Sequence, residues 1–319
     1  MKGSKWLRLT GALLTVLFTV YLLLDSFVIE KSYAAVPETK SAAVGQTAAV
    51  SAAAEKVGAS ALAFEESNTP TRSIALPDDA VLIGSGSAEN TEIRLYTFRF
   101  DDTQVYAADV ITGSALSLRT ALAGNAYGRN LTDKTSSIAA EKDALLAING
   151  DFYGSRDSGL VIRNGVLYRD GGSQGEDLVI YSDGSFEILP AGTKSGEELL
   201  AAGAWQAFSF GPGLVEDGAV SISAFEEVGR SMASNPRTAI GVIEPGHYLF
   251  LVSDGRTSES AGLSLARLAE LMASLGCTQA YNLDGGGSSA MVFQGAVVNK
   301  PTTNGRKIAE RSVSDIVYV

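Results

Sequence analysis

The sequence predicts an α+β fold, a strand-dominated mixed sheet with few helices, preceded by an N-terminal apolar segment and a linker. Three patterns predict this fold class. Residues 92–100 alternate strictly between the two faces of a half-buried strand. The dipeptide Asn164-Gly165 separates two short apolar runs, which is a strong hairpin signal. Residues 265–275 carry leucine or methionine at three- and four-residue spacing, which is typical of an amphipathic helix.

Four more turns predict further strand pairs along the chain. The expected pairs are 92–100 with 104–110, 177–181 with 185–188, 238–243 with 248–253, and 290–293 with 296–298. Residues 248–253 are apolar on both faces, so this strand is expected at the centre of the sheet. The helix is expected to begin after Ser264 and to end at Gly276, and the strand 279–283 follows it.

The N-terminus has the pattern of an export signal. Lys2, Lys5 and Arg8 precede an uncharged, mostly apolar run at residues 9–24, and Ser32-Tyr33-Ala34 fits a small-x-small cleavage site. Residues 1–34 are therefore predicted to be a signal peptide or an N-terminal membrane anchor. Because the lysines precede the apolar run, the rest of the chain is expected outside the cytoplasm, either secreted or anchored to the membrane by this segment.

Composition divides the rest of the chain. Residues 35–72 are rich in alanine, serine and threonine and predict a linker, and residues 73–319 predict a catalytic domain. With 45% apolar residues, the chain can bury a real core. A net charge of −11 argues against nucleic acid as a partner, because phosphate neutralisation needs a basic surface.

Single cysteine and histidine residues exclude several kinds of site. Cys277 has no partner for a disulfide and is expected to be a small buried hydrophobe. His247 follows the turn 244–246 and is expected at a solvated hairpin tip. A serine–histidine–aspartate triad and a histidine- or cysteine-ligated zinc site are therefore not expected.

One acid followed by three glycines and two serines, at residues 284–289, is the strongest candidate for a functional turn. The glycines remove every side chain that would keep a ligand from the backbone, and they permit positive φ. Their amide groups can form a nest that binds an anion. No lysine follows at P-loop spacing, and the turn is not a dinucleotide fingerprint. A tight turn without a ligand is the alternative.

Several segments, in order, resemble the motifs of the phosphodiester glycosidase family over about residues 92–319. Residues 282–289, with the helix predicted before them, resemble the family signature. Segments that resemble its other motifs are 148–153, 210–215, 235–241, 254–256 and 311–313. Two positions depart from the family. Asp151 stands where a small residue is common, and Asp315, where asparagine is common, is given no role.

The resemblance implies hydrolysis of a sugar-1-phosphodiester or phosphorylated glycan, with an oxocarbenium-like transition state and a departing phosphate. Such a site needs a carboxylate near the sugar and charge stabilisation on the phosphate. Asp284 is expected to activate water or attack the anomeric carbon, with Asp151 or Asp254 as its partner. The expected substrate-binding residues are Asn149, Arg237, Arg256, Gly285, Gly286, Gly287, Ser288 and Ser289. No cofactor is required.

Other interpretations of the same residues stay open. Arg237 has a structural alternative, an ion pair with Glu244 or Asp254, and Asp254-Gly255 can be a simple turn. The whole chain can be an anchored module that binds phosphorylated polysaccharide during export. It can also be a phosphodiesterase whose divalent cation is held by Asp151, Asp254 and Asp284.

Overall fold

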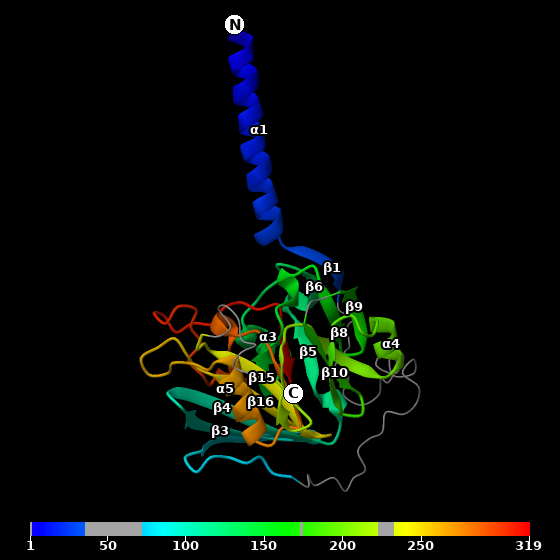
Figure 1. The fold of residues 1–319 in the computed structure, drawn as a ribbon, viewed down its shortest axis with the longest axis vertical. Helices are drawn as coiled ribbons and strands as arrows, with labels where there is room; N and C mark the ends of the chain where they lie inside the picture. The colour runs from blue at the N-terminus through cyan, green and yellow to red at the C-terminus, as the bar shows by residue number, and fades with distance from the viewer. Residues whose placement is uncertain (1, 36–71, 173–174, 223–232) are drawn as a thin grey trace.

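An eight-stranded sheet forms the centre of the computed structural model, which describes residues 2–35, 72–172, 175–222 and 233–319 (Figure 1). In spatial order its strands are β14 (Ala219–Val220), β13 (Gly213–Glu216), β17 (Gln279–Asn282), β15 (Arg237–Glu244), β16 (His247–Ser253), β4 (Thr103–Thr112), β3 (Thr91–Phe100) and β2 (Val81–Ala88). Every residue of β16 is buried. The prediction that this strand is central is confirmed.

Three smaller sheets complete the strand structure. One five-stranded sheet has the order β11 (Phe186–Pro190), β10 (Glu176–Tyr181), β12 (Ala204–Phe208), β8 (Gly159–Arg163) and β9 (Val166–Gly171). The other has the order β19 (Ala296–Val297), β18 (Met291–Phe293), β7 (Leu146–Asn149), β20 (Asp315–Tyr318) and β5 (Arg119–Leu122). A two-stranded sheet joins β1 (Lys31–Ala35) to β6 (Ala126–Arg129).

The strand-dominated fold is confirmed, and so are the predicted hairpins. The pairs β3–β4, β8–β9, β10–β11, β15–β16 and β18–β19 each join neighbours in sequence. The described pairings are all antiparallel, whereas the sequence analysis expected a mixed sheet. β16 and β17 point the same way and are connected through α5, but β15 lies between them and pairs antiparallel with both.

Few helices accompany these sheets. The described α-helices are α1 (Lys2–Phe27), α3 (Thr135–Glu141), α4 (Gly196–Ala201) and α5 (Leu265–Ser274). Single 3-10 turns occur at η1 (Ala115–Ser117), η2 (Ala123–Asn125), η3 (Tyr153–Ser155) and η5 (Gly286–Ser288). In α5 the Ser264 side chain accepts a hydrogen bond from the Arg267 amide, and Gly276 has φ 101°. Both predicted ends of this helix are confirmed.

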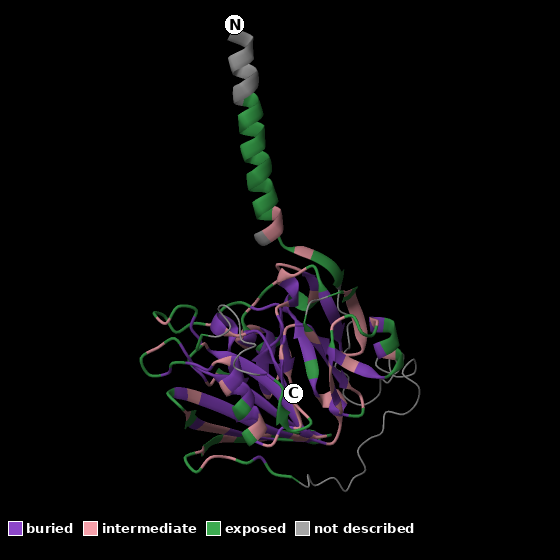
Figure 2. Cartoon of the chain, viewed as in Figure 1, coloured by how far each residue is buried: buried purple, intermediate pink, exposed green. Residues whose placement is uncertain are grey.

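Both faces of the central strands β4, β15, β16 and β17 are buried, whereas the edge strand β2 is mostly exposed (Figure 2). One face packs against α5, whose Leu268 and Met272 belong to the same apolar cluster as Leu249 and Leu251 of β16. The opposite face, with Phe250 and Ile240, packs against apolar residues of the two five-stranded sheets. Burial on both sides explains why the central strands are continuous apolar runs.

The N-terminal helix α1 projects away from the sheets, and its described side chains are mostly exposed (Figures 1 and 2). β1 follows it and pairs with β6, and this strand contains the predicted cleavage site Ser32-Tyr33-Ala34. Among the described residues, no helix combines the length and apolarity needed to cross a membrane. The predicted linker lies almost wholly outside the described residues, and the division at residues 34 and 72 stays a prediction.

The environment of the single histidine differs from the prediction, while that of the single cysteine agrees with it. His247 is only 1% exposed, and its Nε2 lies 2.6 Å from Asp109 Oδ1. The predicted solvated hairpin tip is wrong because β16 begins at His247, which places the ring in the sheet beside β4. Cys277 is buried and free, as expected.

Truncation of the α5 core should test the layer arrangement. Leu268 is fully buried, so Leu268→Ala should lower the free energy of unfolding by about 2–5 kcal/mol through lost contacts and a residual cavity. The matched control is Leu82→Ala on the edge strand β2, where the side chain is exposed and the change should stay within about 0.5 kcal/mol. Urea unfolding of both variants measures the difference, and equal losses would contradict this packing.

Candidate active site

The backbone of the glycine turn is hydrogen-bonded to residues at the ends of β7 and β15. The Leu283 amide donates to Thr238 O at 2.9 Å, and the Asp284 amide donates to Gly150 O at 3.1 Å. The Gly286 amide donates to Pro236 O at 2.8 Å. The sequence predicted that the amides of the three glycines can bind an anion, but the Gly286 amide already donates a hydrogen bond to Pro236 O. The turn is therefore held rigidly from two neighbouring strands.

The glycines are required by close neighbours on three sides. A Cβ at Gly287 would lie 2.5 Å from Thr303 Oγ1, and one at Gly286 would lie 2.9 Å from Arg256 Nη2. Gly286 also has φ 61°, in the left-handed region that favours glycine. A Cβ at Gly285 would lie 3.0 Å from Pro236 O. Because glycine has no side chain, neighbouring groups can pack directly against the backbone of the turn.

Asp284 stands at the start of the turn with its carboxylate in an ion pair. Arg311 Nη2 donates to Asp284 Oδ2 at 2.9 Å, and Ser288 Oγ donates to the same oxygen at 2.5 Å. Burial raises the pKa of the Asp284 carboxyl, while the charge of Arg311 and the Ser288 hydrogen bond oppose that rise. The side chain of Arg311 is 40% exposed, so this ion pair lies between the interior and solvent.

Arg311 is the residue that the sequence reasoning missed as part of the site. It lies 27 positions after Asp284 in a polar segment with no periodic pattern. Its guanidinium also lies 6.0 Å from the ring centre of Phe152. Phe152 has φ 67°, an uncommon conformation for a residue with a side chain. The one available signal was the resemblance of residues 311–313 to the closing motif of the family.

Asn149 and Ser289 are buried next to the glycine turn. Asn149 Nδ2 donates to Asp284 O at 2.7 Å, and Asn149 Oδ1 accepts from Thr238 Oγ1 at 2.8 Å. The prediction that Asn149 contacts the substrate does not fit this geometry, because the amide is fully buried and both ends are engaged. Ser289 is also fully buried, and its Oγ has no partner among the described residues.

Asp151 belongs to a buried ion cluster instead of facing Asp284. Arg163 Nη2 lies 2.8 Å from Asp151 Oδ1 and 2.9 Å from Asp315 Oδ2, and all three side chains are at most 2% exposed. The amides of Tyr153 and Ser209 also donate to Asp151. The predicted role of Asp151 as the partner acid of Asp284 therefore has no support in the geometry. Burial raises the pKa of Asp315 to about 7, and the Arg163 charge opposes this rise.

The Asp254 carboxylate also accepts hydrogen bonds from a backbone amide and from a side chain. Its Oδ1 accepts from the Lys300 amide at 2.8 Å and from Asn299 Nδ2 at 3.2 Å. Asn299 Nδ2 also donates to Ser289 O at 3.0 Å, which connects Asp254 to the end of the glycine turn. Burial raises the pKa of Asp254, and these hydrogen bonds lower it. Asp254 is therefore more than a simple turn residue, although it does not contact Asp284.

Two further arginines contact the turn. Arg237 is buried, its Nε donates to Leu263 O at 2.9 Å, and its Cδ would lie 3.8 Å from a Cβ at Gly285. Arg256 Nη2 and Nε both donate to Asn235 Oδ1, at 2.9 and 3.1 Å, beside Gly286. Two guanidinium groups, those of Arg256 and Arg311, therefore lie at the turn, while Arg237 approaches Gly285 with its Cδ and directs its Nε to Leu263 O.

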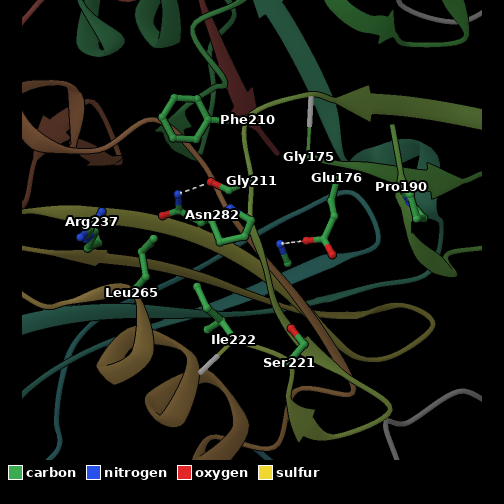
Figure 3. Close-up of a pocket in the computed structure, with 12 residues that line it drawn as sticks. Gly175, Glu176, Pro190, Phe210, Gly211, Ser221, Ile222, Arg237, Leu265 and Asn282 are labelled. Carbon is green, nitrogen blue, oxygen red and sulfur yellow. Dashed lines mark hydrogen bonds between the residues drawn. The ribbon is translucent and has the colours of Figure 1, made fainter. Parts of the chain in front are cut away.

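A cavity of about 690 Å³ opens next to Arg237 (Figure 3). It is lined by Gly175, Glu176, Pro190, Phe210, Gly211, Pro212, Gly213, Ser221, Ile222, Arg237, Leu265 and Asn282. Asn282 precedes Asp284 by two residues at the end of β17, and residues 210–213 belong to a motif singled out in the sequence. The cavity therefore adjoins the glycine turn.

The acids do not form a metal centre in the described part of the chain. Within residues 10–34, 72–172, 175–222 and 233–319, no group of three histidine, cysteine, aspartate or glutamate side chains is placed to hold a metal ion. Asp151 and Asp254 each have separate partners in place of a shared centre with Asp284. The three acids proposed for a divalent cation are thus not brought together.

The fold and the site define a strand-rich domain in which one acid, on a glycine turn, is surrounded by arginines. The profile of the phosphodiester glycosidase family matches residues 142–319, and the chain belongs to that family. A prophage-derived uncharacterized protein of Bacillus subtilis, YomE, is 30% identical over 199 residues, which cover 60% of this chain and 30% of YomE. The chain is thus similar to a protein more than twice the length of the match.

N-acetylglucosamine-1-phosphodiester alpha-N-acetylglucosaminidase is a further relative. The mouse protein is 27% identical over 242 residues, covering 68% of this chain and 45% of that protein, so the chain spans less than half of it. The solved catalytic domain of the zebrafish enzyme, auto-inhibited by its pro-peptide, superposes with a TM-score of 0.58 at 22% identity. This superposition covers 75% of the chain and 87% of the zebrafish domain, and it shows a shared fold.

Stability against pH should test the ion cluster. The pKa of Asp315 in the fold is about 7, above its ordinary 3.8, so its stabilising contribution is complete below pH 3.8 and is lost as the pH rises through about 7. Asp315→Asn carries no such charge, and its free energy of unfolding should decline less than that of the wild type between pH 4 and 7. Denaturant unfolding across this range measures it.

The exposed Asp78→Asn is the matched control for the same loss of an acid. It should keep the wild-type slope, because its carboxyl lies in solvent. An Asp315→Asn slope equal to that of the control would contradict the buried cluster.

Proposed function

We propose that this chain is an extracytoplasmic hydrolase that removes a sugar from a sugar-1-phosphodiester in an envelope or secreted glycopolymer. Members of its family are glycosidases that act on phosphodiester-linked sugars, which supports the reaction class. The observation that carries the proposal is the ion pair of Asp284 with Arg311 at a glycine turn that Arg256 also contacts, with Arg237 lining the adjoining cavity. This grouping suits a substrate that brings a phosphate next to an anomeric carbon.

Asp284 is the acid best placed to act on the sugar. Its carboxylate is held by Arg311 at a partly exposed position, whereas Asp151 and Asp254 are occupied by buried partners. In the reaction, the bond between the anomeric carbon and the bridging oxygen breaks, and the phosphate monoester leaves with the electron pair. Water supplies the oxygen of the new sugar hydroxyl and a proton for the phosphate. Asp284 either activates this water or attacks the anomeric carbon first.

Arg311 has two tasks in this scheme. Its Nη2 stabilises the ionised form of Asp284, and its Nη1, which has no protein partner among the described residues, can donate to a phosphate oxygen. The negative charge that develops on the leaving phosphate is then stabilised by the Arg311 guanidinium, which needs little movement to reach it.

The location outside the cytoplasm is supported by the N-terminal pattern. Lys2, Lys5 and Arg8 precede the apolar residues 9–24, as in exported chains. A phosphorylated glycan of the envelope is then the accessible partner, and α1 would attach the domain to the membrane if it is not cleaved.

The bond that breaks can be identified with labelled water. Purified protein is incubated with a sugar-1-phosphodiester in oxygen-18 water, and both products are analysed by mass spectrometry. Label in the sugar is expected, because cleavage falls between the anomeric carbon and oxygen. Label in the phosphate would indicate a phosphodiesterase, and binding without any product would indicate a phosphopolysaccharide-binding module.

The pH dependence of turnover should identify Asp284 as the acting carboxylate. Asp284→Asn should lower kcat by about 100-fold or more. Activity should fall as the pH drops through the pKa of Asp284. Arg311→Met removes the charge that lowers this pKa, so the acid limb of the pH–rate profile should move to higher pH.

Arg94→Met is the control for the loss of a guanidinium. Arg94 pairs with Glu92 on the exposed face of β3, and 51% of its side chain is exposed. This variant should keep the wild-type profile. An unmoved acid limb in Arg311→Met would remove Asp284 from the mechanism.

A further inference from the structure

We propose that the cavity beside the glycine turn is a glycan subsite in which Glu176 selects a neutral or amino sugar over an acidic one. The inference rests on the proposed function and specifies its substrate class. The cavity lies between β17, β10, the segment before β13 and the start of α5 (Figure 3). A volume of about 690 Å³ is large enough for a sugar with its substituents.

The inner end of the cavity carries an acceptor that lacks a protein partner. Asn282 Nδ2 donates to Gly211 O at 2.7 Å, and since a carbonyl only accepts, this bond fixes which end of the amide is oxygen. Asn282 Oδ1 has no hydrogen-bond partner in the described part of the chain, and the residue is only 2% exposed. An unpaired buried acceptor is costly because it has lost its hydrogen bonds to water, and a donor from a ligand removes that cost.

Figure 3 shows the Asn282 oxygen on the side of the cavity where Arg237 lies. Arg237 adds a positive charge at this end, next to Gly285 of the turn. A hydroxyl donor and a nearby phosphate on the same sugar would satisfy both groups. The reacting end of the sugar is therefore assigned to the side of Asn282 and Arg237.

The opposite end carries an acid. Glu176 Oε2 accepts from the Gly213 amide at 2.7 Å, which orients the carboxylate, while Oε1 has no partner among the described residues. Ser221 lies at the same end (Figure 3). This pair accepts hydrogen bonds from hydroxyl, amide or ammonium groups, whereas a carboxylate on the ligand would meet a like charge.

The walls between the two ends are apolar. Phe210 lies on one side, and Leu265 and Ile222 lie on the other (Figure 3). The guanidinium of Arg156 lies 4.9 Å from the ring centre of Phe210, which fixes the ring from behind. An apolar slot with polar groups at both ends matches a sugar ring, whose faces carry C–H groups and whose rim carries hydroxyls.

Binding of two phosphonate probes tests this assignment without turnover. In both probes a methylene replaces the anomeric oxygen, which prevents hydrolysis. One is the analogue of N-acetylglucosamine 1-phosphate and the other that of glucuronic acid 1-phosphate. Calorimetry should show that the wild-type chain binds the first about tenfold or more tightly, because the second brings its carboxylate to Glu176.

Glu176→Gln keeps an acceptor for the Gly213 amide and removes the charge, so the preference should fall to about threefold or less. Glu92→Gln, on the exposed face of β3 and outside the cavity, is the matched control and should keep the wild-type preference. Ile222→Trp should fill the slot and weaken both probes by at least about tenfold. It provides a second measure if Glu176→Gln does not fold, with circular dichroism confirming the fold of each variant.

Equal affinity of the wild type for both probes, or no binding of either, would overturn the assignment. An unchanged preference in Glu176→Gln would overturn it as well. These outcomes are separate from the failure of the proposed hydrolase. If the chain shows the expected preference but releases no sugar from phosphodiesters, the subsite assignment stands and the hydrolytic function fails. If it releases sugar but shows no preference between the probes, the hydrolytic function stands and the subsite assignment fails.

Discussion

The structure around the site depends on one arginine that is shared by two buried acids. Arg163 on β8 holds Asp315 on β20 and Asp151 just after β7, so it joins two sheets through charge. Removing an ionised carboxylate and the guanidinium from water costs several kcal/mol for each ion, and only close pairing offsets that cost. Burial raises the pKa of Asp315 to about 7, so this second acid is increasingly protonated below that pH. The three side chains must therefore keep this geometry, and the end of β7 is fixed with them. Gly150, next to Asp151, accepts the hydrogen bond from the Asp284 amide.

This arrangement divides the polar residues of the motifs into two groups. Asn149, Asp151 and Asp254 bind backbone or buried side chains and set the position of the glycine turn. Asp284 and Arg311 form an ion pair in which 40% of the Arg311 side chain is exposed. Positioning groups need not touch a ligand to matter, since an error of about 1 Å at the reacting centre is costly in rate.

Sequence patterns were sufficient for local structure and insufficient for contacts between distant segments. Alternation and turn dipeptides predicted the hairpins, because each depends on neighbouring residues. The Asp284–Arg311 pair and the burial of His247 against Asp109 join positions 27 and 138 residues apart, and no local pattern encodes them. Asp315 was given no role because its partner, Arg163, is 152 residues away. The glycine run did predict the turn, but the motif alone did not distinguish amides that bind a ligand from the Gly286 amide, which binds Pro236.

In the proposed reaction, the charge of the site favours a phosphate leaving group over an alcohol. Asp284 is ion-paired with Arg311, so in that state it has no proton to donate to a departing oxygen. The guanidinium groups of Arg256 and Arg311 and the carboxylate of Asp284 at the turn leave an excess of positive charge, in a chain whose net charge is −11. An alkoxide leaving group needs a proton, whereas a phosphate monoester leaves as a stable anion and needs only charge stabilisation. Under the proposed function, an ordinary alkyl glycoside would therefore gain little from this site, because Asp284 in its ion pair with Arg311 supplies no proton to the glycosidic oxygen.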